Sequence, residues 1–318
     1  MSLIELRVAE KIRPDNRAQW KAVGHDWGSD VTTLIEIQKQ NVNSLQKVID
    51  AHVHLSQRGD DALIRFARSN GLRYTMDELL GTMRQHNIVR GLLLSPPLQG
   101  SAPLPNGEII SMCAKSNGML APVITVEPTA REVKAALELA EKNRKEVKAF
   151  KIRLGYVKAP AEDPVFNRLY DYAESEKIPV LFHTGDTAFS TGDLVLSHPL
   201  TLDRLANKRQ ELTMILCHFG NPWFEDVAEL IYKHPNVYAD ISGLVTPSDA
   251  YADKFVEWLA KKISEAIYYV GGAQKVIFGT DYPVTTHSEA LGLVRKLEVE
   301  EGDKEKILWS NAERVFRL

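Results

Sequence analysis

The chain has 318 residues and a formal net charge of −3, with 44% hydrophobic and 25% charged side chains. This balance is typical of a globular protein with a large core, and it excludes an extended basic surface for nucleic acid or membranes. Two cysteines, Cys113 and Cys217, stand far apart in sequence, which argues against a disulfide framework or a thiolate zinc site. The charged N-terminus and the absence of an apolar run of roughly 20 residues predict a cytoplasmic protein.

The first 46 residues are predicted to form a short helical, polar extension in which Trp20 and Trp27 are candidate anchors. Residues 47–318 are predicted to form one domain, because short apolar runs alternate there with segments of helical period. The predicted strands are 47–54, 88–95, 119–126, 147–154, 178–184, 212–218, 237–243 and 275–281. Helical patterns are found at 75–87, 130–145, 164–177, 221–234, 286–300 and 303–318.

Eight strand–helix units are the number expected for a (β/α)8 TIM barrel, and continuous apolar strands suit a sheet that is covered on both sides. A doubly wound open sheet is the alternative. It would normally bring a glycine-rich phosphate-binding turn after an early strand, and neither GxGxxG nor GxxxxGK[ST] is present. The sequence therefore predicts an α/β TIM barrel.

The first predicted strand, in the run KVIDAHVHL, carries Asp50, His52 and His54. Because side chains alternate along a strand, these three are expected on one face, with the intervening apolar residues on the other. Two imidazoles one pleat apart can converge on a metal ion. The alternative is a pair of hydrogen-bonded core or surface histidines.

Three more polar residues are predicted at the carboxyl ends of strands, where barrel enzymes assemble their active sites. His183 ends the fifth strand, His218 the sixth and Asp281 the eighth. A barrel places its first and eighth strands side by side, so Asp281 can neighbour the histidine pair. Imidazoles with a carboxylate suit a divalent ion such as Zn²⁺. Any one of these residues, especially His218, could instead have a structural role. If His218 faces inward, its neighbours Cys217 and Phe219 are expected to face the helical layer.

The pattern DAHVHL…FHTGD…CHFGNPW…YADISG…FGTDYP…NAERVF resembles the amidohydrolase superfamily over residues 47–318. It is most similar to the branch of amidohydrolase-related, aminocarboxymuconate-semialdehyde-decarboxylase-like proteins. The resemblance implies a barrel with a catalytic divalent metal, held by His52, His54, His183 and Asp281. It also implies that His218 is an acid/base close to the metal and that Asp281 handles a proton of the attacking water.

Lys151 and Arg153 share one face of the fourth predicted strand. Some superfamily members carboxylate such a lysine to bridge two metals; the alternatives are a cation for an anionic substrate or neighbouring acid, and a structural salt bridge. His198, on the long loop 185–201, is a candidate substrate contact or an ordinary loop residue. Supporting roles are considered for Asp186, Asn221 and Ser242, whereas the histidines predicted to be ordinary surface residues are His25, His86, His234 and His287.

The sequence therefore predicts a metal-dependent hydrolase that cleaves an amide, ester or lactone bond in a small, anionic substrate. A bound cation lowers the pKa of a coordinated water from 15.7 to about 7. One metal per chain is expected, with Zn²⁺ as the first choice, or two metals if Lys151 is carboxylated. The alternatives are non-oxidative decarboxylation of an aromatic or unsaturated acid, and a non-enzymatic binding barrel. No nucleic acid or membrane partner is expected, and a homo-oligomer stays open.

Overall fold

The computed structural model describes residues 46–56, 62–96, 104–245 and 252–318. The predicted extension at 1–46, with Trp20 and Trp27, therefore lies outside the described residues apart from Gln46. Within the described part of the chain, no helix combines the length and apolar composition needed to cross a membrane.

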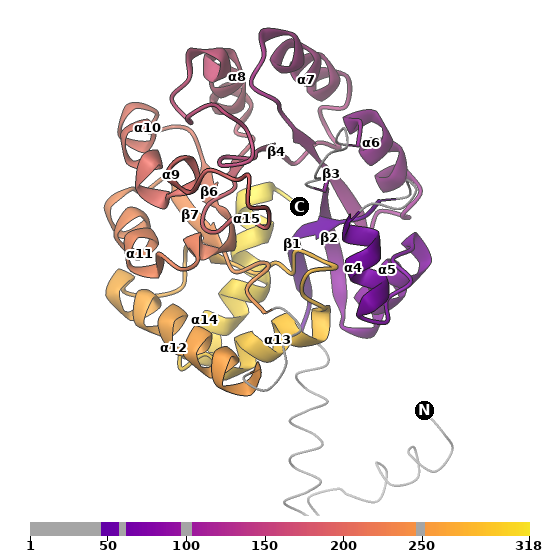
Figure 1. Cartoon of the computed structure of the whole chain (residues 1–318), viewed down its shortest axis with the longest axis vertical. Coiled ribbons are helices and arrows are strands. Elements are labelled where there is room, and N and C mark those ends of the chain that lie inside the picture. Colours follow the sequence, from indigo (N-terminus) through magenta and orange to yellow (C-terminus); the bar gives the residue numbers. More distant parts are fainter. Residues whose placement is uncertain (1–45, 57–61, 97–103, 246–251) are drawn as a thin grey trace, which may run out of the picture. The chain divides into compact units, whose positions relative to one another are not determined.

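Eight parallel strands pair in chain order to form a ring (Figure 1). They are β1 (Val48–His54), β2 (Ile88–Leu94), β3 (Leu120–Thr125), β4 (Ala149–Ile152), β5 (Val180–Phe182), β6 (Met214–Leu216), β7 (Val237–Asp240) and β8 (Val276–Ile277). The end of the ring meets its beginning, because Ala51 N donates to Phe278 O at 3.0 Å and His54 N donates to Tyr282 O at 2.9 Å. The predicted (β/α)8 barrel is confirmed, and the open doubly wound sheet is wrong.

Helices surround the strands on the outside of the ring (Figure 1). The α-helices are α4 (Ala62–Ser69), α5 (Met76–Gln85), α6 (Asn106–Ala114), α7 (Ala130–Lys142), α8 (Asn167–Glu176), α9 (Leu194–Ser197), α10 (Asp203–Lys208), α11 (Phe224–Lys233), α12 (Ala252–Val270), α13 (His287–Lys296), α14 (Glu301–Glu305) and α15 (Asn311–Phe316). Short 3-10 segments are η3 (Pro164–Phe166), η4 (Pro199–Leu202) and η5 (Cys217–Gly220). The segment predicted as one helix at 303–318 is helical but contains a π-helical stretch, η6 (Lys306–Ser310), between α14 and α15.

The starts of several helices follow directly from the sequence. Thr129 accepts a hydrogen bond from Glu132 N at the start of α7. Thr286 and Glu289 form a reciprocal capping box at the start of α13. Such side chains satisfy backbone N–H groups that have no partner within the helix. Local chemistry therefore fixes where α13 begins, just after the segment that carries Asp281.

The inside of the ring is filled at one end by apolar side chains. This inner cluster contains Ile49, Ala51, Leu92, Leu94, Ala121, Val123, Ala149, Leu181, Ile215, Cys217 and Ile277. Ala312 and Phe316 of α15 belong to the same cluster, and α15 packs against β1 and β8. The C-terminal helix therefore closes this end of the barrel, and the polar site lies toward the other end.

The side chains of β1 do not alternate regularly. Ile49 and Ala51 belong to the inner cluster, whereas Val53 packs in the larger cluster between strands and helices. The pairing register with β2 shifts between Asp50 and Val53. This irregularity turns His52 inward directly after Ala51, and it leaves Asp50 on the outer side. The expectation that Asp50 shares a face with the histidines is therefore wrong, because a strict two-residue period does not anticipate an irregularity in the strand.

Candidate active site

Three of the four predicted metal ligands converge at the carboxyl ends of β1 and β8. The Nε2 atoms of His52 and His54 lie 3.4 Å and 2.9 Å from Oδ1 of Asp281. One ligand atom from each of these residues lies within 4.8 Å of the other two. The two histidines are buried, at 1% and 4% exposure. Two nitrogens and one oxygen thus face a common point.

The other ring nitrogens show that a cation fits at this point. Nδ1 of His52 lies 3.2 Å from Oδ2 of Asp240, and Nδ1 of His54 lies 3.1 Å from the Leu94 carbonyl oxygen. Each ring therefore faces an oxygen acceptor on both sides, although a neutral imidazole has a single N–H to donate. Burial and the charge of Lys151 lower the pKa of His52 to about 4, so this ring is neutral near pH 7. A divalent cation bound by His52 Nε2, His54 Nε2 and Asp281 would remove the need for a second N–H on each ring. Each Nδ1–H would then donate to Asp240 or to the Leu94 carbonyl oxygen, which would orient the ring.

The backbone at Asp281 adopts an unusual conformation that brings its carboxylate to the histidines. Its φ is +59°, a left-handed value that is uncommon for a residue with a side chain, and its N–H donates to His52 O at 2.7 Å. Burial alone would raise the pKa of Asp281, but its interactions with the imidazoles of His52 and His54 outweigh it, so the pKa lies below its usual range. Asp281 is therefore a carboxylate at neutral pH.

Gly243 leaves the space that this carboxylate occupies. A Cβ at that position would lie 2.8 Å from Oδ2 of Asp281 and 3.0 Å from Nδ1 of His218. The φ of Gly243 is +67°, which glycine adopts without steric cost. A side chain here would displace either the carboxylate or the imidazole.

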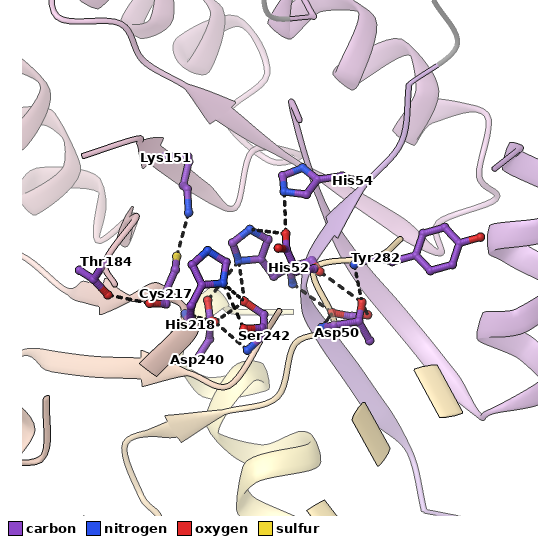
Figure 2. A network of polar contacts seen from close by, with 12 residues as sticks. Asp50, His52, His54, Lys151, Thr184, Cys217, His218, Asp240, Ser242 and Tyr282 are labelled. Atoms are coloured by element: carbon purple, nitrogen blue, oxygen red, sulfur yellow. Dashed lines mark hydrogen bonds and ion pairs between the residues drawn. The ribbon is translucent and has the colours of Figure 1, made fainter. Parts of the chain in front are cut away.

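Asp240 of β7 connects His52 to His218 and was missed in the sequence analysis. Its Oδ1 accepts hydrogen bonds from His218 N at 2.9 Å and from Ser242 Oγ at 2.5 Å (Figure 2). Burial opposes ionisation of Asp240, but its hydrogen bond with His52 and the nearby imidazoles lower the pKa well below its usual range. In the segment YADISG, Asp240 and Ser242 are two residues apart and are therefore expected on the same face of the strand. This spacing could have identified Asp240 as inward-facing.

His218 is held by the same network. Its Nδ1 lies 3.1 Å from the Ser242 carbonyl oxygen and 3.0 Å from Ser242 Oγ. A hydrogen bond from Nδ1–H to that carbonyl leaves Nε2 as the unprotonated nitrogen. The φ of His218 is +61°, and its ring centroid lies 5.0 Å from that of His52. The structure thus places His218 beside the predicted metal ligands.

His183 lies next to His218 but does not join the converging set. Their ring centroids are 4.9 Å apart, and the His183 ring also packs on Tyr156, with centroids 4.7 Å apart. Nε2 of His183 lies 2.9 Å from the Asp186 carbonyl oxygen. Among the described residues, two groups of ligand atoms lie close enough together to hold a metal, His52–His54–Asp281 and His52–His218–Asp240, and neither includes His183. Its role as a fourth ligand stays a prediction.

Lys151 is buried inside the barrel, and its Nζ lies 2.9 Å from Sγ of Cys217 (Figure 2). Cys217 belongs to the inner cluster, so the expectation that it faces the helical layer is wrong, whereas Phe219 does pack in the outer layer. Among the residues that the structure describes, no carboxylate pairs with Lys151 within ion-pair distance. The buried cation is therefore available to an anionic group, and carboxylation of Lys151 stays a prediction.

Arg153 and His198 have partners away from the histidines. Arg153 pairs with Glu127, and its buried Nε has no hydrogen-bond partner within the described chain. The His198 ring packs on Trp223 in a tilted arrangement, with centroids 4.6 Å apart, and its Nε2 lies 3.4 Å from Oδ2 of Asp226. These contacts join its loop to α11. Substrate contact by either residue stays a prediction.

Two histidines predicted to lie on the surface are buried. His234 lies 2.8 Å from Asp203, and His287 lies 3.4 Å from Asp50. The prediction was wrong for both, because ends of helices that pack on a barrel can be buried without an apolar signal. His86 is partly buried, and His25 lies outside the described residues.

The comparisons with known proteins agree with this geometry. A model of the amidohydrolase family matches residues 49–318, so the chain belongs to that family. It is a metal-dependent enzyme of the amidohydrolase superfamily. No curated protein sequence matches significantly.

Solved structures share the barrel at low sequence identity. An uncharacterized TIM-barrel protein from Bordetella bronchiseptica is 21% identical, with a TM-score of 0.67 over 85% of this chain and 98% of that chain. A probable 2-pyrone-4,6-dicarboxylic acid hydrolase from Acinetobacter baumannii is 17% identical, with a TM-score of 0.61 over 86% and 100%. A dihydroxybenzoic acid decarboxylase from Polaromonas, with bound manganese and 2-nitroresorcinol, is 15% identical, with a TM-score of 0.61 over 86% and 98%. These likenesses show the fold.

Proposed function

We propose that the protein is a metal-dependent hydrolase that opens an ester, lactone or amide bond in a small carboxylate-bearing molecule. The observation that carries the proposal is the convergence of the His52 and His54 imidazoles with the Asp281 carboxylate, each imidazole being oriented by a second partner. A divalent cation bound there would act as a Lewis acid and lower the pKa of a water molecule. Zn²⁺ and Mn²⁺ both suit the donor set.

The protein residues would divide the remaining work. Asp281, ionised at neutral pH, would orient the attacking water and accept its proton. His218 would donate or accept a proton through Nε2, because Ser242 and Asp240 fix its Nδ1 and backbone. Lys151 would hold a carboxylate of the substrate, since a buried cation without a carboxylate partner is stabilised by an incoming anion. Arg153 would assist through its buried Nε, which has no hydrogen-bond partner among the described residues.

Decarboxylation is the second candidate, and the Polaromonas structure favours it, because it pairs a similar barrel with a dihydroxybenzoic acid decarboxylase. The same residues serve that chemistry. Lys151 and Arg153 would position the carboxylate, and His218 would supply the proton that replaces it. The two candidates differ in their products: hydrolysis adds one oxygen from water, whereas decarboxylation releases CO₂.

The test uses protein loaded with Mn²⁺ or Zn²⁺ and two probes, 2-pyrone-4,6-dicarboxylate as a lactone and 2,6-dihydroxybenzoate with a ¹³C-labelled carboxylate. The reactions are run in H₂¹⁸O and analysed by mass spectrometry. The proposal expects the ring-opened acid with one ¹⁸O atom and no labelled CO₂. Labelled CO₂ without ¹⁸O in the organic product would establish the decarboxylase instead. The absence of any turnover across a broader panel of lactones, esters and amides would contradict the hydrolase.

A further inference from the structure

Asp50 is a fully buried carboxylate that contacts both segments from which the converging ligands come. Its Oδ1 accepts hydrogen bonds from His52 N at 3.1 Å and from Thr280 N at 3.0 Å. Its Oδ2 accepts one from Thr280 Oγ1 at 2.6 Å. The acid therefore joins the backbone of β1, at the first histidine, to the residue directly before Asp281 (Figure 2).

Thr280 extends this connection past Asp281. Its Oγ1 accepts a hydrogen bond from Tyr282 N at 3.0 Å, so the residues on both sides of Asp281 are fixed. The Tyr282 ring stacks on the His287 ring, with centroids 5.4 Å apart and planes 9° apart. Both neighbours of Asp281 are thus connected to Asp50, Thr280 directly and Tyr282 through Thr280 and His287. These contacts hold Asp281 in its left-handed conformation.

His287 fixes the outer side of Asp50. Its Nε2 lies 3.4 Å from Oδ2 of Asp50, and its Nδ1 lies 3.1 Å from Oγ1 of Thr82 on α5. The carboxylate therefore accepts hydrogen bonds from β1 and from the segment after β8, and the His287 imidazole of α13 lies within ion-pair distance of it. No solvent reaches it, since its exposure is 0%.

A role in packing alone accounts poorly for this arrangement. A buried carboxylate is costly unless its hydrogen bonds are satisfied, and an apolar side chain of similar size often serves stability equally well. An apolar residue could not accept the hydrogen bonds of His52 N and Thr280. The chemistry of the acid matches a need to fix the spacing between the histidine pair and Asp281.

We propose that Asp50 is a positioning residue that sets the distance between His52 and Asp281 and thereby the affinity of this site for a divalent metal. The inference rests on the proposed function in one respect, namely that the site binds such a metal. His287 and Thr280 act through Asp50 and do not touch the metal. Partners that orient metal ligands typically contribute 10–100-fold to metal affinity.

The test measures the Kd of Mn²⁺ or Zn²⁺ by competition with a chelator, alongside Tm, for the full chain and its variants. D50N keeps the shape but replaces one acceptor oxygen with an amide, and we expect its Kd to rise about 10–100-fold. T280V should weaken binding in the same direction, whereas T280S, which keeps the hydroxyl, should bind metal like the wild type. D203N, which breaks a hydrogen-bonded acid–histidine contact elsewhere, should leave the Kd unchanged.

The outcomes distinguish a failure of the proposed function from a failure of the positioning role of Asp50. If the wild type binds no metal, the proposed function fails and this inference fails with it. If the wild type binds metal and folded D50N binds it equally tightly, Asp50 is a structural residue and the inference alone is overturned. Should D50N not fold, the pair T280V and T280S decides: equal metal affinity in both would overturn the proposal, and weaker binding in T280V only would support it.

Discussion

The two ends of the barrel interior are built by the same strands but are lined by different types of side chain. At the end closed by α15, the inward positions are apolar and fully buried, as in Leu181, Ile215 and Ile277. At the other end, the inward positions carry imidazoles, carboxylates and the Lys151 cation. Burying apolar surface stabilises the fold, whereas burying charged groups opposes it unless each group is paired. One end is therefore suited to stability and the other to binding a charged ligand.

Three residues at the polar end adopt positive φ values: Asp281 after β8, and His218 and Phe219 after β6. Some helix ends elsewhere, such as Lys177 after α8 and Arg317 after α15, do so as well. Such conformations cost free energy and persist where the surroundings enforce them, often at functional sites. Substitutions at the two ends should therefore have separable effects: those at the polar end should change metal affinity or rate, and those at the apolar end should change stability.

The largest effect on rate is expected at His218. H218N should retain the metal but lower kcat by roughly 10²–10⁴-fold, because it removes the group that exchanges a proton with the substrate. Metal content and kcat are to be measured on the same preparation. A metal-free H218N protein would make His218 a ligand, and a fully active one would make it structural.

At the apolar end, L181A should reduce the free energy of unfolding by about 2–5 kcal/mol, because it leaves a cavity among fully buried side chains. Denaturant titration measures this loss. The folded fraction should bind metal with unchanged Kd, and the milder variant I215V should lose only about 0.5–1.5 kcal/mol. A large change in metal affinity in L181A would show that the two ends are coupled.

At the polar end, a substitution of Asp240 tests a residue that would orient a metal ligand without touching the metal. D240N should weaken metal binding by about 10–100-fold, because the amide can no longer orient both His52 and the His218 backbone. Isothermal titration with Mn²⁺ measures the change. Wild-type affinity in folded D240N would mean that His52 is oriented by packing alone.

The smallest effect is expected at Asp203, an acid of the outer helix α10. Hydrogen bonds from Lys233 and His234 lower the pKa of Asp203, so its contribution to stability is present above the ordinary aspartate pKa of about 3.9 and is lost as the pH falls through the lowered value. D203N should therefore cost up to about 1 kcal/mol at pH 7, since the group is partly exposed. Thermal unfolding should show this difference shrinking below pH 4. A difference that persists in acid would assign the effect to packing.

The sequence was sufficient for the barrel and for the convergence of His52, His54 and Asp281, whose roles stay predictions. Apolar runs marked all eight strands, and His183, His218 and Asp281 lie shortly after the ends of β5, β6 and β8. The misassigned orientations have a common physical cause. Counting back in steps of two from an inward His52 would place Asp50 inward, and an inward His218 would place Cys217 outward. The irregularity in β1 and the positive φ at His218 instead turn each histidine to the same side as the residue before it.

Contacts between distant elements could not be predicted in the same way. Asp240 lies 188 residues from its partner His52, and His287 pairs with Asp50 across the junction of the first and last strands. Their importance depends on which side chains the closed ring brings together. Periodicity within a single strand or helix carries no information on such pairs.

Metal binding at this site is tested by the metal content of the chain after dialysis against Mn²⁺ or Zn²⁺. Elemental analysis of the wild type should give about one ion per chain, as expected for one set of histidine and carboxylate ligands with a position left for water. H54A and D281N should lose the ion, while H198A, whose contacts lie toward α11, should retain it. A wild type that binds no ion, or an H54A/D281N double variant that binds as much as the wild type, would contradict the account.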